Sequence, residues 1–130
     1  MQKKKTTWFW AWIILGTVRK AEVNKPRARC EVWENLIIIN APNPGKAFLK
    51  AERIGRQSAG DCRGTLRFFG EPAKQIYLGI QSIGVIHEEL KDGAEITWNL
   101  KRLTFVKAKK LVRSKINLLR KLSKEFNHTK

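Results

Sequence analysis

The side chains of this chain that are best suited to chemistry are scattered along the sequence. Its only cysteines are Cys30 and Cys62, and its only histidines are His87 and His128. A metal site requires such ligands in a close cluster, and these four positions show no ligand spacing. The sequence therefore predicts neither a metal site nor a cofactor, with surface histidines and packing cysteines as the simpler interpretation.

A nucleophilic cysteine is the strongest catalytic alternative. Cys62 lies in a glycine-flanked loop between Asp61 and Arg63, and a neighbouring cation favours the reactive thiolate. His87 is a conceivable base, since residues distant in sequence can meet in a fold. The sequence offers no third group to orient the histidine and no oxyanion hole, so an ordinary loop thiol is the preferred interpretation.

Three carboxylates are candidates for general acid–base chemistry. Glu34 follows Trp33 in an apolar segment, where burial favours the neutral acid unless a partner such as an arginine is present. Glu88 and Glu89 precede a predicted turn and are expected to be solvated. We expect no enzymatic activity, and a hydrolase that uses Cys62 or Glu34 is the weakest alternative.

Positive charge is concentrated at the two ends of the chain, whose formal net charge is +16. Residues 101–130 contain eleven Lys/Arg and one acid, and residues 1–30 contain eight Lys/Arg and one acid. Residues 31–100 contain eight Lys/Arg and nine acids. Net charge informs about partners and solubility, not about the fold. The pattern predicts a near-neutral folded module between two basic ends. As domains we expect an α+β domain over 1–103 and a basic amphipathic helical extension over 104–130.

The extension has the periodicity of one long amphipathic helix over 104–126. Apolar side chains recur at helical spacing from Phe105 to Phe126, and Lys and Arg occupy most other positions. Such a helix would be roughly 30 Å long. The cations predicted to contact a polyanion are Lys107, Lys109, Lys110, Arg113, Arg120, Lys121 and Lys124.

Three interpretations fit this basic helix. Its apolar face could dock on the sheet of its own domain, which would leave the lysines as a solvated face. Its charged face could bind nucleic acid phosphates, helped by Lys3–Lys5, Arg27 and Arg29, with strong salt dependence and weak sequence preference. It could also lie on an anionic membrane surface or in the groove of a partner.

The preceding residues predict a mainly antiparallel sheet of about five strands with one packing helix, in the order β-β-α-β-β-β. Strand 8–18 and the end of strand 30–40, at 36–39, are apolar on both faces and are expected to be buried on both, with 8–18 central. That burial would hide Trp8, Trp10 and Trp12. The remaining predicted strands cover 65–69, 74–86 and 94–100.

Turn and cap residues predict where the packing helix of the α+β domain begins and ends and where its strands turn. Asn43 is suited to cap a helix over 44–54, with Pro44 at its first position and Gly55 in its C-terminal turn. Gly79 and Gly84 predict bulges or bends in strand 74–86. The loop 70–72 is a predicted turn, and Asp92-Gly93 is a turn that leads to the last strand.

The N-terminus has the outline of a secretory signal, with Lys3–Lys5 before the apolar run 8–15. Three tryptophans are unusual in such a run, no small-residue cleavage site follows, and the run is too short to cross a bilayer. A buried strand is the preferred interpretation. We therefore expect a cytoplasmic protein with reduced cysteines, although pairing of Cys30 with Cys62 stays open.

An ordered set of short segments runs from the first strand to Trp98. It includes WFWA at 8–11, LIII at 36–39, the helix 47–55 and the hairpin 90–97. In this order the segments resemble a family of small bacterial domains of unknown function, family 4288. The resemblance implies a compact α+β domain and brings no established activity or catalytic residues. The basic extension after Trp98 has no counterpart in the family pattern.

The sequence thus favours a non-catalytic binding protein whose basic ends contact nucleic acid or another polyanion. An alternative is a protein-interaction module of the toxin-neutralising or phage-defence type, bound to an acidic protein partner. A membrane surface is the less favoured partner.

Overall fold

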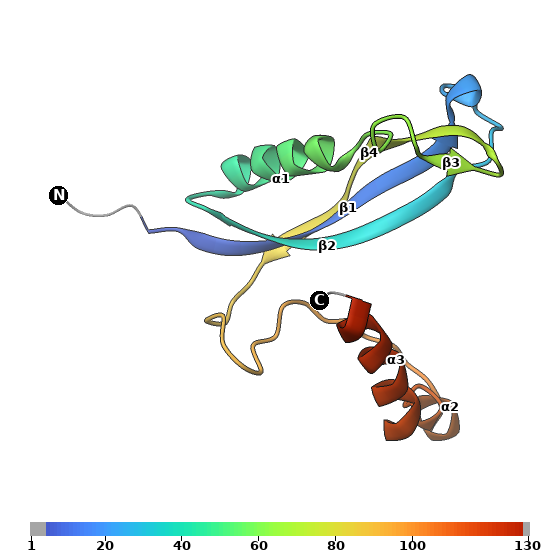
Figure 1. The fold of residues 1–130 in the computed structure, drawn as a ribbon. Helices are drawn as coiled ribbons and strands as arrows, with labels where there is room; N and C mark the ends of the chain where they lie inside the picture. Colours follow the sequence, from blue (N-terminus) through green and yellow to red (C-terminus); the bar gives the residue numbers. More distant parts are fainter. Residues whose placement is uncertain (1–4, 129–130) are drawn as a thin grey trace. The chain divides into compact units, whose positions relative to one another are not determined.

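The computed structural model describes residues 5–128, shown as a ribbon in Figure 1. The chain divides between Trp98 and Asn99 into two compact units. The first unit contains a four-stranded antiparallel sheet and one α-helix, and the second unit contains two further helices. The α+β class predicted from the sequence is confirmed, with four strands in place of about five.

β1 (Thr7–Arg19) is the central strand. It pairs antiparallel with β2 (Glu31–Ala41) on one side and with β4 (Glu71–Val85) on the other. The two-residue strand β3 (Arg67–Phe68) adds to the end of β4 and completes the order β2-β1-β4-β3. The predicted central position of strand 8–18 is therefore confirmed. An apolar strand is stabilised most where neighbouring strands flank it on both sides.

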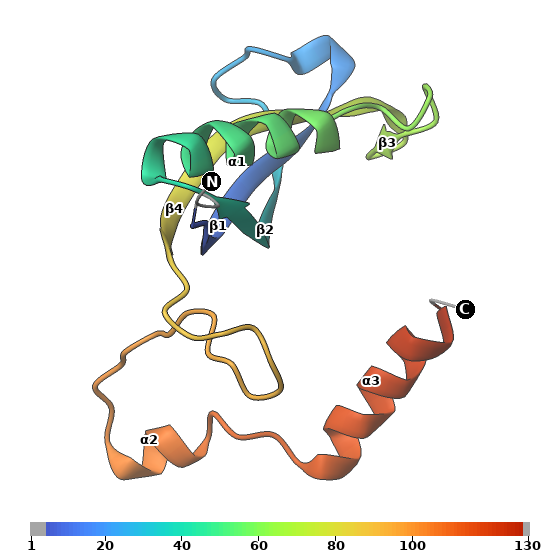
Figure 2. The ribbon, with the colours of Figure 1, turned by 90° about the vertical axis from the view of Figure 1, so that its left-hand side faces the viewer.

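Helix α1 (Pro44–Ser58) covers one face of the sheet, as Figure 2 shows. Asn43 caps it as predicted, since its Oδ1 accepts the Lys46 N–H at 2.9 Å. The buried side of α1 is made of small residues that let the helix approach the strands closely. Two clusters form the core, Phe9 with Ala41 and Ala47, and Ala11 with Ile39 and Ala51.

α1 runs one turn further than the sequence predicted. Gly55, expected in the terminal turn, is buried inside the helix. A Cβ at this position would lie 2.5 Å from Tyr77 Cε1 and 3.1 Å from Ile13 Cγ2. Gly55 is therefore a packing residue that admits the Tyr77 ring between helix and sheet, and it does not end the helix.

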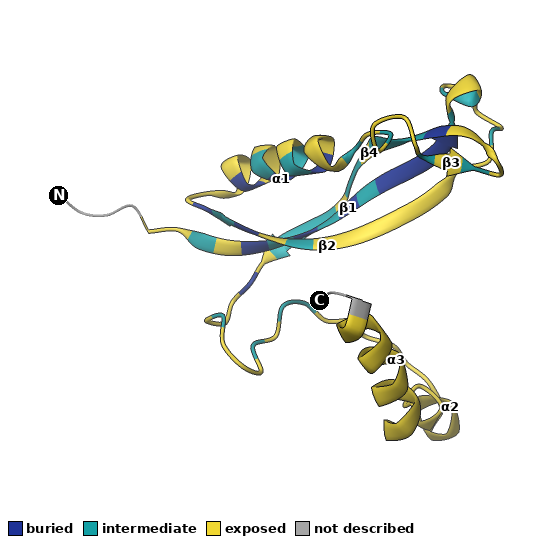
Figure 3. Ribbon diagram, in the orientation of Figure 1, coloured by how far each residue is buried: buried dark blue, intermediate teal, exposed yellow. Residues whose placement is uncertain are grey.

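The second face of the sheet contradicts the predicted burial. Among the described residues of the first unit, no helix or strand covers it, and Figure 3 shows β2 mostly exposed. Pairing places Trp10 beside Ile38 and Trp12 beside Leu36 on this face. Trp8, Leu36 and Ile38 are exposed, and Trp10 and Trp12 are half-buried. An apolar pattern on both faces requires two covering layers, and α1 supplies one.

β4 contains the irregularity predicted at Gly79, whereas the pairing is regular at Gly84, where a bulge or bend was also predicted. The pairing with β1 skips Gln81 and Leu78, which lie on either side of Gly79. The φ of +147° at Gly79 is readily adopted only by glycine. Gly84 keeps regular pairing, and the Trp10 ring lies directly over it because there is no side chain in the way.

Residues 94–100 do not form the predicted fifth strand. The Asp92-Gly93 turn is present, with a φ of +85° at Gly93. However, β4 ends at Val85, and the Glu88 carboxylate accepts the Glu95 N–H. A side chain thus takes the hydrogen bond that a neighbouring strand would have taken, and the alternating pattern has no partner strand.

Two further predicted elements are corrected. Strand 65–69 is reduced to β3, because Phe69 and Gly70 form the two-residue turn into β4 with φ values of +52° and +76°. The single helix predicted over 104–126 is two helices, α2 (Phe105–Lys109) and α3 (Lys115–His128). Neither has a buried residue among those described, so no buried apolar face stabilises one continuous helix over the range.

Candidate functional site

The basic arm (residues 99–128) is built by local capping. The Thr104 hydroxyl accepts the Lys107 N–H at 3.3 Å and starts α2, and the Ser114 hydroxyl accepts the Asn117 N–H at 3.2 Å and starts α3. A hydroxyl at this position satisfies a backbone donor that the helix cannot. The sequence reasoning overlooked both caps, although a Ser or Thr before a helical run is their usual signal.

Arg120, Lys121 and Lys124 form the basic face of α3. At about 100° per residue, these three side chains fall within an arc of roughly 100° around the helix axis. Glu125, at the border of this arc, is the only acid in the described arm. The other side of α3 presents the apolar residues Ile116, Leu118, Leu119, Leu122 and Phe126, all of them exposed.

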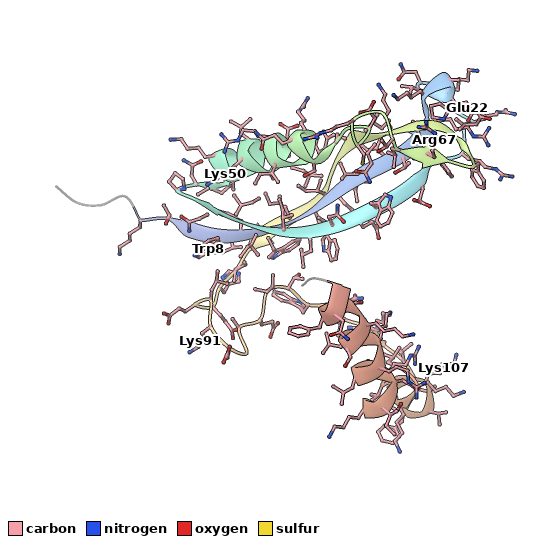
Figure 4. All side chains as sticks on the ribbon, viewed as in Figure 1. Trp8, Glu22, Lys50, Arg67, Lys91 and Lys107 are labelled. Atoms are coloured by element: carbon pink, nitrogen blue, oxygen red, sulfur yellow. The ribbon has the colours of Figure 1, made fainter. Side chains whose placement is uncertain are left out.

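The remaining predicted cations lie on α2 and on the connection to α3. Lys107 is labelled on α2 in Figure 4. The Lys109 Nζ lies 4.5 Å from the centroid of the Phe105 ring, a cation–π contact. Lys110 caps the end of α2, and its carbonyl accepts a hydrogen bond from the Arg113 guanidinium at 2.7 Å. These contacts leave every one of the cations exposed to solvent.

All seven predicted polyanion-contacting residues are thus exposed, but they do not share one helix face. The structure divides them into a group over 107–113 and a group over 120–124. Every described side chain from Asn99 to Asn127 is exposed. Their role in binding stays a prediction.

A second basic surface lies at one end of the sheet. The guanidinium carbons of Arg19 and Arg29 are 5.5 and 5.4 Å from the Phe69 ring centroid. The Phe68 ring stacks on Phe69 with centroids 4.5 Å apart. Arg27, named with Arg29 as a helper, is exposed in the same loop. The Phe68 ring and the two guanidinium groups contact Phe69, which is still 60% exposed.

Acidic residues neutralise part of this second surface. Lys20 Nζ lies 2.7 Å from an Asp61 carboxylate oxygen, and Arg19 lies 3.6 Å from Glu22. The Lys20 hydrogen bond, with help from the Gly64 N–H, lowers the pKa of Asp61. None of the ion pairs between described residues involves a cation of the α3 face.

A third group of cations borders a shallow depression between α1 and the end of β2. Lys46, Lys50 and Arg53 line it beside Leu49. Lys50 has a structural role, because its Nζ donates a hydrogen bond to the Asn40 carbonyl at 2.9 Å and links α1 to the end of β2. Lys3 and Lys4, two of the predicted N-terminal helpers, lie outside the described residues, and Lys5 is exposed.

The conceivable Cys62–His87 pair is not brought together. Gly60, next to the Cys62 loop, bridges to Gln75 near the start of β4, whereas His87 follows the end of β4. These points are separated by roughly 35 Å of extended strand. Cys30 and Cys62 are both unpaired and exposed, and the side chain of His128 lies outside the described part.

Of the three candidate carboxylates, Glu34 differs from expectation, and Glu88 and Glu89 are solvated as predicted. Glu34 is exposed on β2 and has no ion-pair partner among the described residues, so the predicted buried setting and arginine partner are wrong. Glu88 and Glu89 are exposed. In the described part of the chain, no three Cys, His or acidic side chains are grouped for metal binding, and no helix is long and apolar enough to cross a bilayer.

The fold and these surfaces define a class: a small α+β domain, with one helix on a four-stranded antiparallel sheet, followed by a basic helical arm. Comparison with known families is more specific. The chain belongs to the family described as "Domain of unknown function (DUF4288)", whose model matches residues 8–98. The resemblance inferred from the segments is therefore confirmed, and the basic arm lies outside the match. No curated protein and no solved structure matches the chain.

Proposed function

We propose that the protein is a binding protein whose basic arm contacts a nucleic acid through its phosphates. The observation that supports this most is the exposed basic face of α3, where Arg120, Lys121 and Lys124 share one arc and stand opposite the apolar side chains. The cations over 107–113 extend the contact. A helix that presents unpaired cations on one side attracts the closely spaced charges of a phosphate backbone.

Such a contact has a recognisable thermodynamic signature. Each neutralised phosphate releases condensed counterions, so log K falls with log salt by roughly 0.9 per contact on duplex DNA. Lysine and arginine contacts to phosphates position the protein but do not read bases. We therefore expect similar affinity for unrelated sequences, and single strands as well as duplexes as ligands.

The test is fluorescence anisotropy of labelled single- and double-stranded oligonucleotides across a salt series. The variant Arg120→Gln/Lys121→Gln/Lys124→Gln should bind about 10- to 100-fold more weakly at low salt and should lower the salt slope by about three. Affinity equal to wild type in this variant would contradict the proposal.

A matched control removes the same charge elsewhere. Lys46→Gln/Arg53→Gln/Lys91→Gln neutralises three exposed cations of the first unit, including two at the depression beside α1. We expect its slope to stay within about one of the wild-type value. If the control loses binding and the α3 variant does not, the depression is the anion site and the arm is not.

The runner-up function is a protein-interaction module that neutralises a toxin or acts in phage defence. The same exposed cations support it, since an acidic protein partner would be steered by the +16 charge. Absence of oligonucleotide binding at low salt, together with arm-dependent binding to an acidic protein, would favour this function. Arm-dependent binding to anionic vesicles would instead favour a membrane surface, for which the exposed apolar side of α3 is suited.

A further inference from the structure

The face of the sheet opposite α1 is a continuous apolar surface, here called the open sheet face. Its central residues are Trp8, Trp10, Trp12, Leu36, Ile38 and Leu78. Figure 4 labels Trp8 on the side of the sheet away from Lys50 of α1. Ile38 is 44% exposed and Leu78 is 52% exposed, although both are large apolar residues in paired strands. Sheets bury such a face against a second layer.

The charge of this face restricts what can cover it. The β2 and β4 residues paired with Trp8, Trp10, Trp12 and Ile14 include a single ionisable side chain, Glu34, and no cation. A nucleic acid or an anionic membrane would find nothing to pair with its phosphates there. In a chain of charge +16, this is also a face on which two copies would not repel each other.

The shape of the open sheet face suits a second sheet. The Trp10 ring lies over Gly84, where a Cβ would overlap it, so the ring packs directly on the strand backbone at this point. Two sheets that pack face to face are about 10 Å apart, with side chains of both inner faces interdigitating. An identical face related by a two-fold axis supplies the same apolar surface in return.

The area is sufficient for a small dimer interface. The eleven residues of β2, at about 3.3 Å each across three strands about 4.8 Å apart, give a flat area of roughly 500 Å². Side-chain relief raises the accessible surface above this flat area, toward the roughly 600–800 Å² per partner of a standard interface. We infer that a second copy of this chain covers the open sheet face, forming a symmetric sheet-on-sheet dimer.

Sedimentation equilibrium of the full chain tests this inference. At about 0.5 M salt, which screens the repulsion between basic arms, and at about 50 μM protein, above the roughly micromolar Kd of a small interface, we expect twice the chain mass of 15.0 kDa. A wild-type protein that stays monomeric under these conditions overturns the inference. If that monomer sediments with neutral phosphatidylcholine vesicles, a lipid surface and not a second copy covers the open sheet face, and the inference is overturned as well.

Two variants locate the interface. Ile38→Lys on β2 and Leu78→Lys on β4 place a charge on the open sheet face and should each weaken the dimer about 30-fold or more. The control Leu49→Lys changes an equally apolar residue, 64% exposed on α1, and should leave the dimer intact. Wild-type and both face variants dimerising with the same Kd would move the interface elsewhere and overturn the inference.

A measurement on the wild-type chain keeps the test independent of variant folding. Diluting the protein through its Kd should increase acrylamide quenching of tryptophan fluorescence, because Trp8, Trp10 and Trp12 become accessible on dissociation. Quenching that does not change across a dilution in which the mass halves would show that the tryptophans are not in the interface, and would overturn the inference.

Discussion

Different interactions stabilise the two units of this chain, each within itself. In the first unit, α1 buries Ala47 and Ala51 against β1 and β2, and paired strands satisfy the backbone. In the arm, every described side chain from Asn99 to Asn127 is exposed, and the helices depend on the caps at Thr104 and Ser114.

The residues that stabilise the fold and the residues that carry most of the excess positive charge therefore lie in different units. Most of the free energy of unfolding should reside in the first unit, since burial of apolar area is the dominant favourable contribution to folding. The larger excess of positive charge lies in the arm, where a substitution changes what the protein attracts and leaves the core untouched. The following changes test this separation, from the largest expected effect to the smallest.

Removing core volume should give the largest effect. Ile39 is 2% exposed and packs with Ala11 and Ala51, so Ile39→Ala should lower the free energy of unfolding by about 2–5 kcal/mol through lost burial and a cavity. Urea unfolding followed by tryptophan fluorescence measures it. Leu119→Ala, the matched change in the arm, should leave the midpoint unchanged; a shift as large as that of Ile39→Ala would contradict the separation.

Adding one methyl group at Gly55 should give the next effect. Gly55→Ala places a Cβ within 2.7 Å of two Tyr77 ring carbons, and overpacking of this kind costs about 1–3 kcal/mol. The higher helix propensity of alanine offsets up to about 1 kcal/mol of that cost. Thermal unfolding measures the difference, and a stabilised variant would show that α1 does not approach the sheet this closely.

Removing the helix caps should have smaller effects, and the effect on the urea midpoint should differ between the two units. Asn43 caps α1 and Ser114 caps α3, and each is worth about 1 kcal/mol to its own helix. Asn43→Ala should lower the urea midpoint. Ser114→Ala should reduce helical circular dichroism with the midpoint unchanged. Equal effects of the two variants on the midpoint would mean that the arm unfolds together with the sheet.

Tyr77 should make stability depend on alkaline pH. Burial raises the pKa of Tyr77 above its ordinary value of 10.0, the Glu52 carboxylate raises it further, and Arg56 acts against both. The neutral phenol is therefore favoured in the folded state. The resulting contribution is complete below about pH 10 and is lost as pH rises through the folded pKa, because the unfolded phenol ionises first.

The measurement uses Tyr77 as the single tyrosine of the chain. Tyrosinate absorbance should appear at higher pH in the folded than in the unfolded protein, and Tyr77→Phe should flatten the alkaline loss of stability. Phe should cost little stability at neutral pH, because the Tyr77 hydroxyl is buried without a hydrogen-bond partner among the described residues. Coincident titrations of folded and unfolded protein would contradict this account.

Local signals predicted several elements of the first unit, although not the absence of strand 94–100 or the shortness of β3. The apolar run from Trp8 to Val18 predicted a central strand, Asn43-Pro44 predicted the start of α1, and Gly79 predicted the irregular β4. Each of these depends on a few neighbouring residues. The pattern could not show that only one face of β2 is covered, because burial depends on how many layers the fold contains.

The limits are similar for the basic arm. The cations are read directly from the sequence, but helical periodicity alone did not reveal the break between Lys109 and Lys115. Periodicity describes which side of a helix is apolar. Whether the helix runs without a break depends on packing, and on side chains such as that of Ser114 that cap a new helix instead of continuing the old one. The sequence therefore located the charged residues and missed their division into two groups.

The most direct test of the account is hydrogen–deuterium exchange of the full chain with and without a saturating oligonucleotide at low salt. Amides of α2 and α3, whose described side chains are exposed, should exchange rapidly in the free protein and slow on binding, while β1, β2 and β4 stay unchanged. Slowed exchange confined to the loop between β1 and β2 or to α1, with the arm unchanged, would contradict the account.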